Sequence, residues 1–260
     1  EQISYIIDHA QDKVIFCDLT FVPMFESIAD QLESVKAVVI MTDLENMPET
    51  QLSNVYCYEK LMADVSDDFS WPVIDELHAS SLCYSSGTTG SPKGVLYSHR
   101  STILHSFACC SADGLAISGR DTVMPVVPMF HVNAWGMPYA CTMAGAKIVF
   151  PGGAMDGKSL AELLTDEKVT FSAGVPTVWL MLLQHLKETG GSLPHLQRTV
   201  VGGSALPQSM IETFEDDYDV ACIHAWGMTE MSPLGTVGHM TNRLLSDKDA
   251  DIMRYKVKQG

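Results

Sequence analysis

The sequence has few basic residues for its length. Lysine and arginine number 16 against 32 aspartates and glutamates among 260 residues, which gives a formal net charge of -16. This acidic surplus disfavours non-specific binding to nucleic acid or to anionic membrane surfaces. An anionic ligand would have to be held locally, by backbone N–H groups, a few cations or a metal.

Long apolar runs are also lacking, and no charged-then-apolar stretch opens the sequence. The longest apolar stretch, near residues 171–183, is interrupted by glycine and proline. We therefore expect neither a membrane span nor secretion. The seven cysteines are odd in number and scattered, without C-x-x-C spacing, which disfavours zinc ribbons and disulfide frameworks and favours a cytoplasmic location.

What the sequence does contain is a regular alternation of short β-rich runs and longer helix-patterned runs, within a composition that is 46% hydrophobic. This alternation predicts an α/β fold with layered α/β/α subdomains and mostly parallel sheets. Strands are predicted at 14–18, 36–41, 146–150, 169–173, 198–203 and 220–227, helices at 22–32, 158–168, 178–188 and 206–216, and a loosely structured connection at 43–79. Three predicted strands end in turns of small residues, SAGVP (172–176), GGSALP (202–207) and AWGMTE (225–230). Ligands of parallel sheets bind beyond such carboxyl ends.

The stretch YSSGTTGSPKG (84–94) combines glycines, hydroxyl residues and one lysine directly after an apolar run. Its glycines would let the backbone approach a phosphate, and Lys93 would add a positive charge. The Walker A pattern fails here, because Pro92 and Gly94 stand where that pattern has glycine and a hydroxyl residue, and a strand follows instead of a helix. From the residues alone, a mobile hairpin remains an equal alternative.

The longer stretch LCYSSGTTGSPKGV (82–95) resembles the phosphate-loop signature of the adenylate-forming superfamily, which includes acyl-CoA synthetases, luciferases and peptide-synthetase adenylation domains. The resemblance implies that the loop binds the phosphates of ATP and that Ser85 supplies the hydroxyl nearest a magnesium ion. The loop residues implied to bind nucleotide are Ser85, Ser86, Gly87, Thr88, Thr89, Gly90 and Lys93.

PMFHVNAWG (128–136) resembles the segment that lines the acyl pocket in acyl-CoA synthetases. His131 would then contact the carboxylate or the α-phosphate, and Trp135 would form a wall or gate of the acyl tunnel. If this segment is helical, the two side chains share one face because they are four residues apart. Taken alone, such a pair is more often packed in a core. SAGVPTVWL (172–180) resembles the next family segment and implies no catalytic role.

VVGGSALP (200–207) resembles the strand and turn that hold adenine, which implies contacts from Gly203, Ser204 and Ala205. The same stretch partly matches the hydrolase elbow G-x-S-x-G, but Leu206 stands where the last glycine belongs. Ser204 is therefore a weak candidate for a hydrolytic nucleophile.

AWGMTEMSP (225–233) resembles the aromatic-Gly-x-Thr-Glu motif of the family. It implies that Trp226 stacks on adenine, that Thr229 contacts the phosphate region, and that Glu230 holds magnesium, which prefers oxygen ligands. Gly227 and Met228 belong to the same nucleotide-binding stretch. Together the resemblances name Lys93, His131 and Glu230 as the catalytic residues.

The resemblance implies an acid–thiol ligase that converts a carboxylic acid, ATP and coenzyme A to an acyl-adenylate and then to a thioester. The fullest likeness is to medium- and long-chain fatty acyl-CoA ligases and to methylmercaptopropionate-CoA ligases. This likeness indicates an apolar acid and a role in fatty acid metabolism. No carboxylate lies in FHVNAWG, which disfavours an amino acid substrate.

The chain is expected to be the central part of the large domain of such an enzyme. About 1–80 would form a first α/β portion and about 81–240 the ATP- and acyl-binding portion, without the small C-terminal domain. A catalytically incomplete nucleotide-binding fragment is therefore an alternative. A metal or redox role for His99, His105 and the pair Cys109 and Cys110 is a further one, although ligand spacing is missing. Oligomeric state stays open, with a homodimer among the alternatives.

Overall fold

The computed structural model describes residues 1–85 and 90–259, and the chain divides into two compact units. One unit comprises Glu1–Asp75 with Ser85–Gly94, and the other comprises Glu76–Tyr84 with Val95–Gly260. Both units contain parallel strands with helices between them, which confirms the predicted α/β fold class.

The first unit is built on a three-stranded parallel sheet in the order β1-β2-β3. Its elements are α1 (Gln2–Ala10), β1 (Val14–Cys17), α2 (Val22–Ser27), β2 (Ala37–Ile40), β3 (Val55–Cys57) and α3 (Tyr58–Ala63). The strands predicted at 14–18 and 36–41 are confirmed. The helix predicted over 22–32 is interrupted at Ile28, beyond which a 3-10 turn follows.

Strand β3 and helix α3 correct the prediction for 43–79, which was a loosely structured connection. The three residues of β3 are too few to show a periodic pattern in the sequence. The strand exists because its backbone pairs with that of β2, at Val38↔Val55 and onward.

The second unit contains a six-stranded sheet in the order β11-β10-β9-β8-β6-β7. Its strands are β6 (Thr122–Pro125), β7 (Lys147–Ile148), β8 (Phe171–Gly174), β9 (Arg198–Val201), β10 (Ala221–Gly227) and β11 (Leu234–Val237). All neighbours pair in parallel except β10 and β11. The sequence prediction misses β6 and β11. The short run of β6 ends in a proline, a residue that argues against a central strand.

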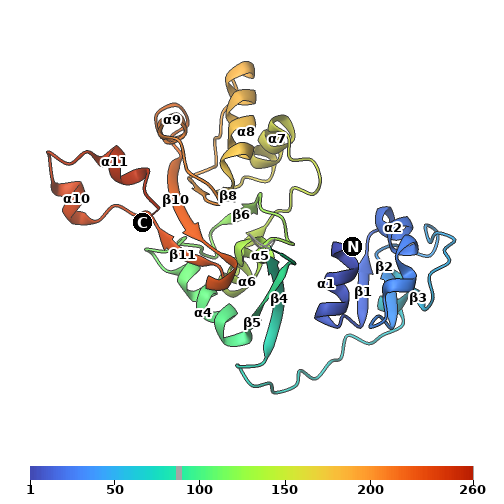
Figure 1. Cartoon of the computed structure of the whole chain (residues 1–260). Coiled ribbons are helices and arrows are strands. Elements are labelled where there is room, and N and C mark those ends of the chain that lie inside the picture. Colours follow the sequence, from blue (N-terminus) through green and yellow to red (C-terminus); the bar gives the residue numbers. More distant parts are fainter. Residues whose placement is uncertain (86–89, 260) are drawn as a thin grey trace. The chain divides into compact units, whose positions relative to one another are not determined.

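Helices pack on both faces of this sheet (Figure 1), with α4 (His99–Cys110) and α6 (Met137–Ala144) in one core and α7 (Gly157–Asp166) and α8 (Pro176–Thr189) in the other. The unit also contains α5 (Val132–Trp135), α9 (Gln208–Glu212), α10 (Asn242–Ser246) and α11 (Ile252–Lys256). Within the described residues, none of the helices is long and apolar enough to cross a bilayer.

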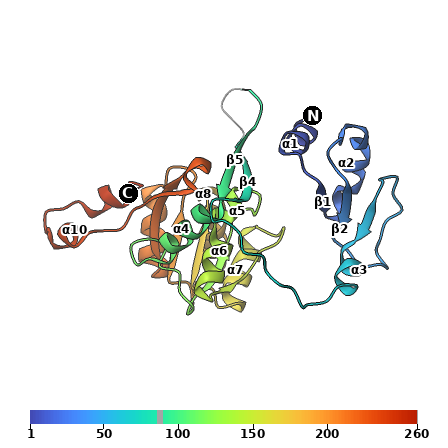
Figure 2. The ribbon, with the colours of Figure 1, turned by 90° about the horizontal axis from the view of Figure 1, so that it is seen from below.

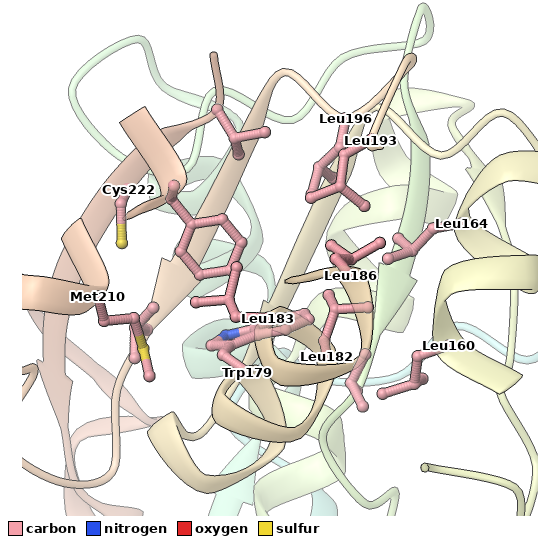
Figure 3. Close-up of a cluster of buried hydrophobic side chains, with 14 of the residues drawn as sticks. Leu160, Leu164, Trp179, Leu182, Leu183, Leu186, Leu193, Leu196, Met210 and Cys222 are labelled. Carbon is pink, nitrogen blue, oxygen red and sulfur yellow. The ribbon is translucent and has the colours of Figure 1, made fainter. Parts of the chain in front are cut away.

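Alternate residues of each central strand enter different hydrophobic cores. Met124 and Val201 pack with α7 and α8, whereas Val123 and Val200 pack with α4 and α6. The period-2 alternation of strand side chains thus produces the two layers of core. In the first core, Trp179 of α8 lies beside leucines of the same helix and near Met210 (Figure 3). Its ring meets that of Phe214 edge to face, with centroids 6.0 Å apart.

Strands β4 (Ala79–Ser85) and β5 (Lys93–Ser98) form a separate two-stranded sheet, in which they run side by side (Figure 2). Both strands match the sequence prediction of a strand before and after the loop at 84–94. Tyr97 of β5 is buried with Cys83 of β4 and Val132 of α5.

A buried ion pair joins the amino-terminal side of β9 to the turn before β6. Arg198 donates to both carboxylate oxygens of Asp121, at 3.0 and 3.1 Å. Burial by itself would raise the pKa of Asp121. Hydrogen bonds from Arg198, Thr170 and the Ser118 backbone, together with the positive charge of Arg198, have the larger effect and lower this pKa to about 2. The contribution of Asp121 to stability is therefore fully present above pH 3.8, its ordinary pKa, and is lost as the pH falls toward 2.

Replacing Arg198 by leucine should destabilise the second unit strongly. The substitution leaves the Asp121 carboxylate buried without its counter-charge, which costs about 3–5 kcal/mol. Urea unfolding followed by circular dichroism measures the loss. The control is Glu162→Ala, because Glu162 faces Lys158 on the exposed side of α7 at 3.8 Å. An Arg198→Leu protein as stable as this control would contradict the assigned role.

Candidate functional site

A pocket of about 290 Å³ lies at the carboxyl ends of β9 and β10, within the second unit. Its lining comes from four regions of the sequence, 105–115, 131–135, 200–203 and 225–234. The lining residues are His105, Leu115, His131, Val132, Trp135, Val200, Gly202, Gly203, Ala225, Trp226, Gly227, Met228, Thr229, Glu230, Pro233 and Leu234. Three of the four predicted pocket and nucleotide motifs within this unit, those at 128–136, 200–207 and 225–233, therefore contribute side chains or backbone to one cavity.

The glycine turn after β9 forms one wall. A Cβ added to Gly202 would lie 3.2 Å from Cη2 of Trp135 and 3.1 Å from the carbonyl oxygen of Ala225, so the glycine lets the indole ring approach the strand closely. Gly203 has a φ of 80°, a left-handed conformation that favours glycine. Of the predicted adenine contacts, Gly203 lines the pocket, whereas Ser204 and Ala205 follow it on the exposed surface.

Ser204 lacks the surroundings of a hydrolytic nucleophile. His224 contacts Ser204 through the backbone, because its Nε2 lies 3.4 Å from the carbonyl oxygen of Ser204. Within the described part of the chain, no base is bonded to the Ser204 hydroxyl. A nucleophile needs such a base within hydrogen-bond reach.

The opposite wall is formed by α5, and its single turn is left-handed. The φ values of Val132–Trp135 are 44°, 55°, 49° and 56°, and Gly136 continues the turn at 70°. The sequence predicts that His131 and Trp135 share one face if this segment is helical. Both side chains do line the pocket, although the turn has the opposite hand from an ordinary α-helix.

A left-handed turn of non-glycine residues is strained, by roughly 1–2 kcal/mol for each residue, so tertiary contacts must hold it. One such contact is the hydrogen bond from Asn133 Nδ2 to Ser81 Oγ of β4, at 3.1 Å. Another is the burial of Val132, which is 4% exposed. The sequence could not reveal this turn, because neither valine nor tryptophan favours positive φ.

The end of β10 supplies the third wall. A Cβ on Gly227 would lie 2.4 Å from the carbonyl oxygen of Pro233, so no other residue fits there without a shift. The ring of Trp226 covers Gly235 of β11, where an added Cβ would lie 2.5 Å from Cε3. The 3-10 turn Thr229–Met231 follows, and it carries Glu230 into the pocket lining.

Tyr97 fixes the turn that carries Glu230, and the sequence motifs did not reveal it. Its hydroxyl donates to the carbonyl oxygen of Thr229 at 2.5 Å, across 132 positions of sequence. Burial, and then the nearby Cys83 and Glu230, raise the pKa of Tyr97, so the hydroxyl keeps its proton and remains a donor. In the sequence, Tyr97 is marked only by its place three residues beyond the loop stretch.

His105 of α4 is a second residue that the motifs missed. It lines the pocket yet is only 8% exposed, and burial lowers its pKa to about 4. An added Cβ on Gly136 would lie 2.6 Å from its Nδ1 and Cε1. The sequence analysis considered His105 only as part of a metal or redox site. Among the residues the structure describes, no group of three or more His, Cys, Asp or Glu side chains is arranged to hold a metal, so that alternative gains no support.

The loop stretch is described in part. Ser85 ends β4, Lys93 begins β5, and Gly90 between them has a φ of 94°. These residues belong to the first unit. The predicted nucleotide contacts Ser86, Gly87, Thr88 and Thr89 lie outside the described residues.

Two charged groups of the predicted site are free to meet a ligand. Within residues 1–85 and 90–259, neither the Lys93 ammonium nor the Glu230 carboxylate forms an ion pair, although several other lysines and glutamates do. Both residues are exposed. The carboxylate of Glu230 therefore fits a hard cation such as Mg²⁺, which is commonly bound by one or two carboxylates together with phosphate oxygens.

Comparison with known proteins identifies relatives over nearly the whole chain. The family model described as AMP-binding enzyme matches residues 1–255. The chain is 54% identical over 236 residues to the 3-methylmercaptopropionyl-CoA ligase of Ruegeria lacuscaerulensis, covering 91% of this chain and 44% of that protein. It is 53% identical over 236 residues to the medium-chain-fatty-acid–CoA ligase of Ectopseudomonas oleovorans, covering 91% and 43%. The chain thus spans less than half the length of these curated relatives.

A solved structure of a long-chain-fatty-acid-CoA ligase from Archaeoglobus fulgidus has the same fold. It superposes with a TM-score of 0.80 at 20% identity, over 99% of this chain and 49% of that chain. At this identity the likeness supports the fold and nothing more.

Removing the hydroxyl of Tyr97 should loosen the Thr229–Met231 turn. Tyr97→Phe leaves the ring in place but takes the donor from the Thr229 carbonyl, which we expect to cost about 1–2 kcal/mol of stability. Hydrogen–deuterium exchange of residues 228–232 should accelerate. Tyr139→Phe is the control, because Tyr139 is 41% exposed and lies outside the pocket. Equal exchange in the two variants would show that Tyr97 does not hold the turn.

Proposed function

Because this chain belongs to the AMP-binding enzyme family, we propose that the protein carrying it activates an apolar carboxylic acid with ATP and then transfers the acyl group to coenzyme A. The first product would be an acyl-adenylate and the second an acyl-CoA thioester. The family assignment confirms the membership predicted from the motifs, and the individual residue roles below are proposals.

The observation that carries this proposal is the convergence of three motifs on one pocket. The segments at 128–136, 200–207 and 225–233 are separated by about sixty and by twenty residues, yet all of them line the cavity at the carboxyl ends of β9 and β10. Such an edge of a parallel sheet is where ligands of α/β proteins bind.

The acid would lie between the α5 turn and the strand ends. Leu115, Val200 and Leu234 give this part of the pocket an apolar surface, and the ring of Trp135 forms its wall. His131, exposed at the start of the turn, would contact the carboxylate or the α-phosphate. Trp135 would also act as a gate for the acyl chain.

The nucleotide would be held by two groups of backbone and side-chain donors. The loop residues Ser85 to Gly90, with Lys93, would bind the phosphates. The turns after β9 and β10 would bind the adenosine part, with Trp226 against adenine and Thr229 near the phosphates. The adenosine contacts proposed are Gly203, Ser204, Ala205, Trp226, Gly227, Met228 and Thr229.

Magnesium would be held by Glu230 and by the hydroxyl of Ser85, together with phosphate oxygens. When bound, it supplies positive charge that offsets the charge of the phosphates. Lys93 adds a further positive charge from this chain, whose net charge of -16 otherwise repels an anion.

The first chemical step brings together two anions, because a carboxylate oxygen attacks the α-phosphorus and pyrophosphate leaves. The barrier is therefore one of charge and placement, and no protein nucleophile is required. Lys93 and the N–H groups at 87–90 would follow the charge that develops on the leaving group. His131 would orient the acid. The thiolate of coenzyme A then displaces AMP.

The names of the relatives support an apolar acid. Two of them are named for methylmercaptopropionyl-CoA and medium-chain fatty acids, and they are 54% and 53% identical to this chain over 236 aligned residues. Among the described residues that line the pocket, Glu230 is the one acidic side chain. The ammonium group of an amino acid would therefore find no second carboxylate in this lining. A cytoplasmic location, a homodimer and the division into portions 1–80 and 81–240 remain predictions from the sequence.

Lys93→Ala and Glu230→Ala should each slow adenylate formation at least about tenfold in the full-length protein. The first variant removes a positive charge that offsets the phosphates, and the second removes the carboxylate proposed to hold magnesium. Pyrophosphate exchange measures this step. Lys158→Ala and Glu162→Ala are matched controls, since both residues lie on the exposed side of α7. Unchanged exchange in both site variants would contradict the assignment.

A hydroxamate trap run on this 260-residue chain separates the two functional alternatives. With ATP, Mg²⁺ and a panel of fatty acids, a chain that forms acyl-adenylate yields acyl hydroxamate above the level without ATP. A chain that binds nucleotide but catalyses nothing yields only the background amount while still binding AMP in a dialysis assay. The full-length protein is the positive control.

A further inference from the structure

We propose that the pocket prefers acids whose chain carries one hydrogen-bond acceptor, and that the imidazole N–H of His105 is the donor that recognises it. This inference rests on the proposed function, because it names the class of acid that the same pocket would take. An ether or keto oxygen, a hydroxyl or a thioether sulfur in the chain would each present the required lone pair.

The two histidines of the pocket lie at different depths. His131 is exposed, whereas His105 is 8% exposed, and both line the same cavity. An acid whose carboxylate is near His131 would therefore extend its chain toward His105. The lining of the cavity includes the apolar side chains of Leu115, Val200 and Leu234. His105 is thus a buried polar side chain in the same lining as these apolar residues.

The His105 ring packs closely against the backbone of Gly136. It fills the space beside Gly136, where an added Cβ would lie 2.6 Å from Nδ1 and Cε1. Gly136 ends the left-handed turn that carries Trp135. The backbone of this turn and the ring of His105 therefore fit together only because residue 136 has no side chain.

The single N–H group of the neutral His105 ring has no strong hydrogen-bond acceptor within the described residues. Burial lowers the pKa of His105 to about 4, so near neutral pH the ring carries a single N–H. Its described partner is the sulfur of Cys109, 3.7 Å from Nδ1 and 3.6 Å from Nε2. Burial, with Cys110 and Cys141, raises the pKa of Cys109 to about 12, so the thiol keeps its proton.

The thiol can therefore donate to the unprotonated ring nitrogen, but its sulfur is a weak acceptor for the ring N–H. Among residues 1–85 and 90–259, neither ring nitrogen has an oxygen or nitrogen partner. A buried donor left in this state is unfavourable, and a methylene chain does not relieve it. An acceptor atom at the matching position of the acid does, which is the physical basis of the preference.

A series of acids that differ in the position of one ether oxygen tests this proposal in the full-length protein. Heptanoate is compared with four analogues in which an ether oxygen replaces C3, C4, C5 or C6. For the wild type, kcat/KM relative to heptanoate should peak at one position, about fivefold above its neighbours, the value of one neutral hydrogen bond. The ratio is used because it cancels any general loss of activity in a variant.

Three variants assign the peak to the donor. His105→Leu and His105→Phe remove the N–H and should flatten the profile, and either of them suffices if the other does not fold. His105→Gln keeps an N–H donor and should retain a peak at the same or an adjacent position. His195→Leu is the control, because His195 is exposed and lies outside the pocket. Melting temperatures verify that each variant is folded.

The outcomes are distinct. A flat profile in the wild type, or an unchanged peak in His105→Leu or His105→Phe, would overturn the assignment and leave His105 as a core residue. Failure of the wild type to adenylate heptanoate and every analogue would instead count against the proposed function. A peak that depends on an N–H at position 105 supports the inference.

Discussion

The parallel pairing of β9 with β10 is the constraint on which the candidate site depends. Their register places Val201 opposite His224, so the residues that follow, Gly202 and Ala225, emerge beside each other. The carbonyl oxygen of Ala225 would in fact lie 3.1 Å from a Cβ on Gly202. Two sequence motifs twenty residues apart thereby become adjacent walls of one pocket. The helices packed on both faces of the sheet make this pairing stable, because parallel strands need both faces covered.

The wall formed by α5 has a different origin. The left-handed turn Val132–Trp135 is unfavourable by itself, and it is held by burial of Val132 and by the bond from Asn133 to Ser81. Tyr97 ties the neighbouring β5 strand to the Thr229 carbonyl. Strand β5 is thereby linked to the turn that bears Glu230, and its residues pack against α5. Strain at a binding site is tolerated where surrounding contacts determine the conformation.

In the proposed chemistry, individual groups and not the net charge of the chain must bind the anionic ATP. A chain with a net charge of -16 cannot attract ATP by its overall field, so the anion must be met by particular groups. Lys93, backbone N–H groups and a cation held by Glu230 would provide them. The apolar part of the pocket holds one buried, neutral imidazole, and burial is the reason both for its neutrality and for its value as a donor. In the proposed function, the same pocket would combine a charged end at Glu230 with recognition of the acyl chain by His105.

The sequence by itself determined the α/β class, four strands (β7, β8, β9 and β10) and three helices (α7, α8 and α9) of the second unit, and the family. The motifs at 82–95, 128–136, 200–207 and 225–233 made this possible because they are local and depend on short-range backbone requirements. It also named His131, Trp135, Gly203 and the stretch 226–230, all of which line the pocket. It missed β3, whose three residues gain their structure from pairing with β2. Tyr97 and His105 were hidden for a related reason. Their roles come from a carbonyl 132 positions away and from a glycine 31 positions away, and only tertiary packing brings such partners together. The hand of the α5 turn was decided in the same way, since local preference opposes it and distant contacts impose it.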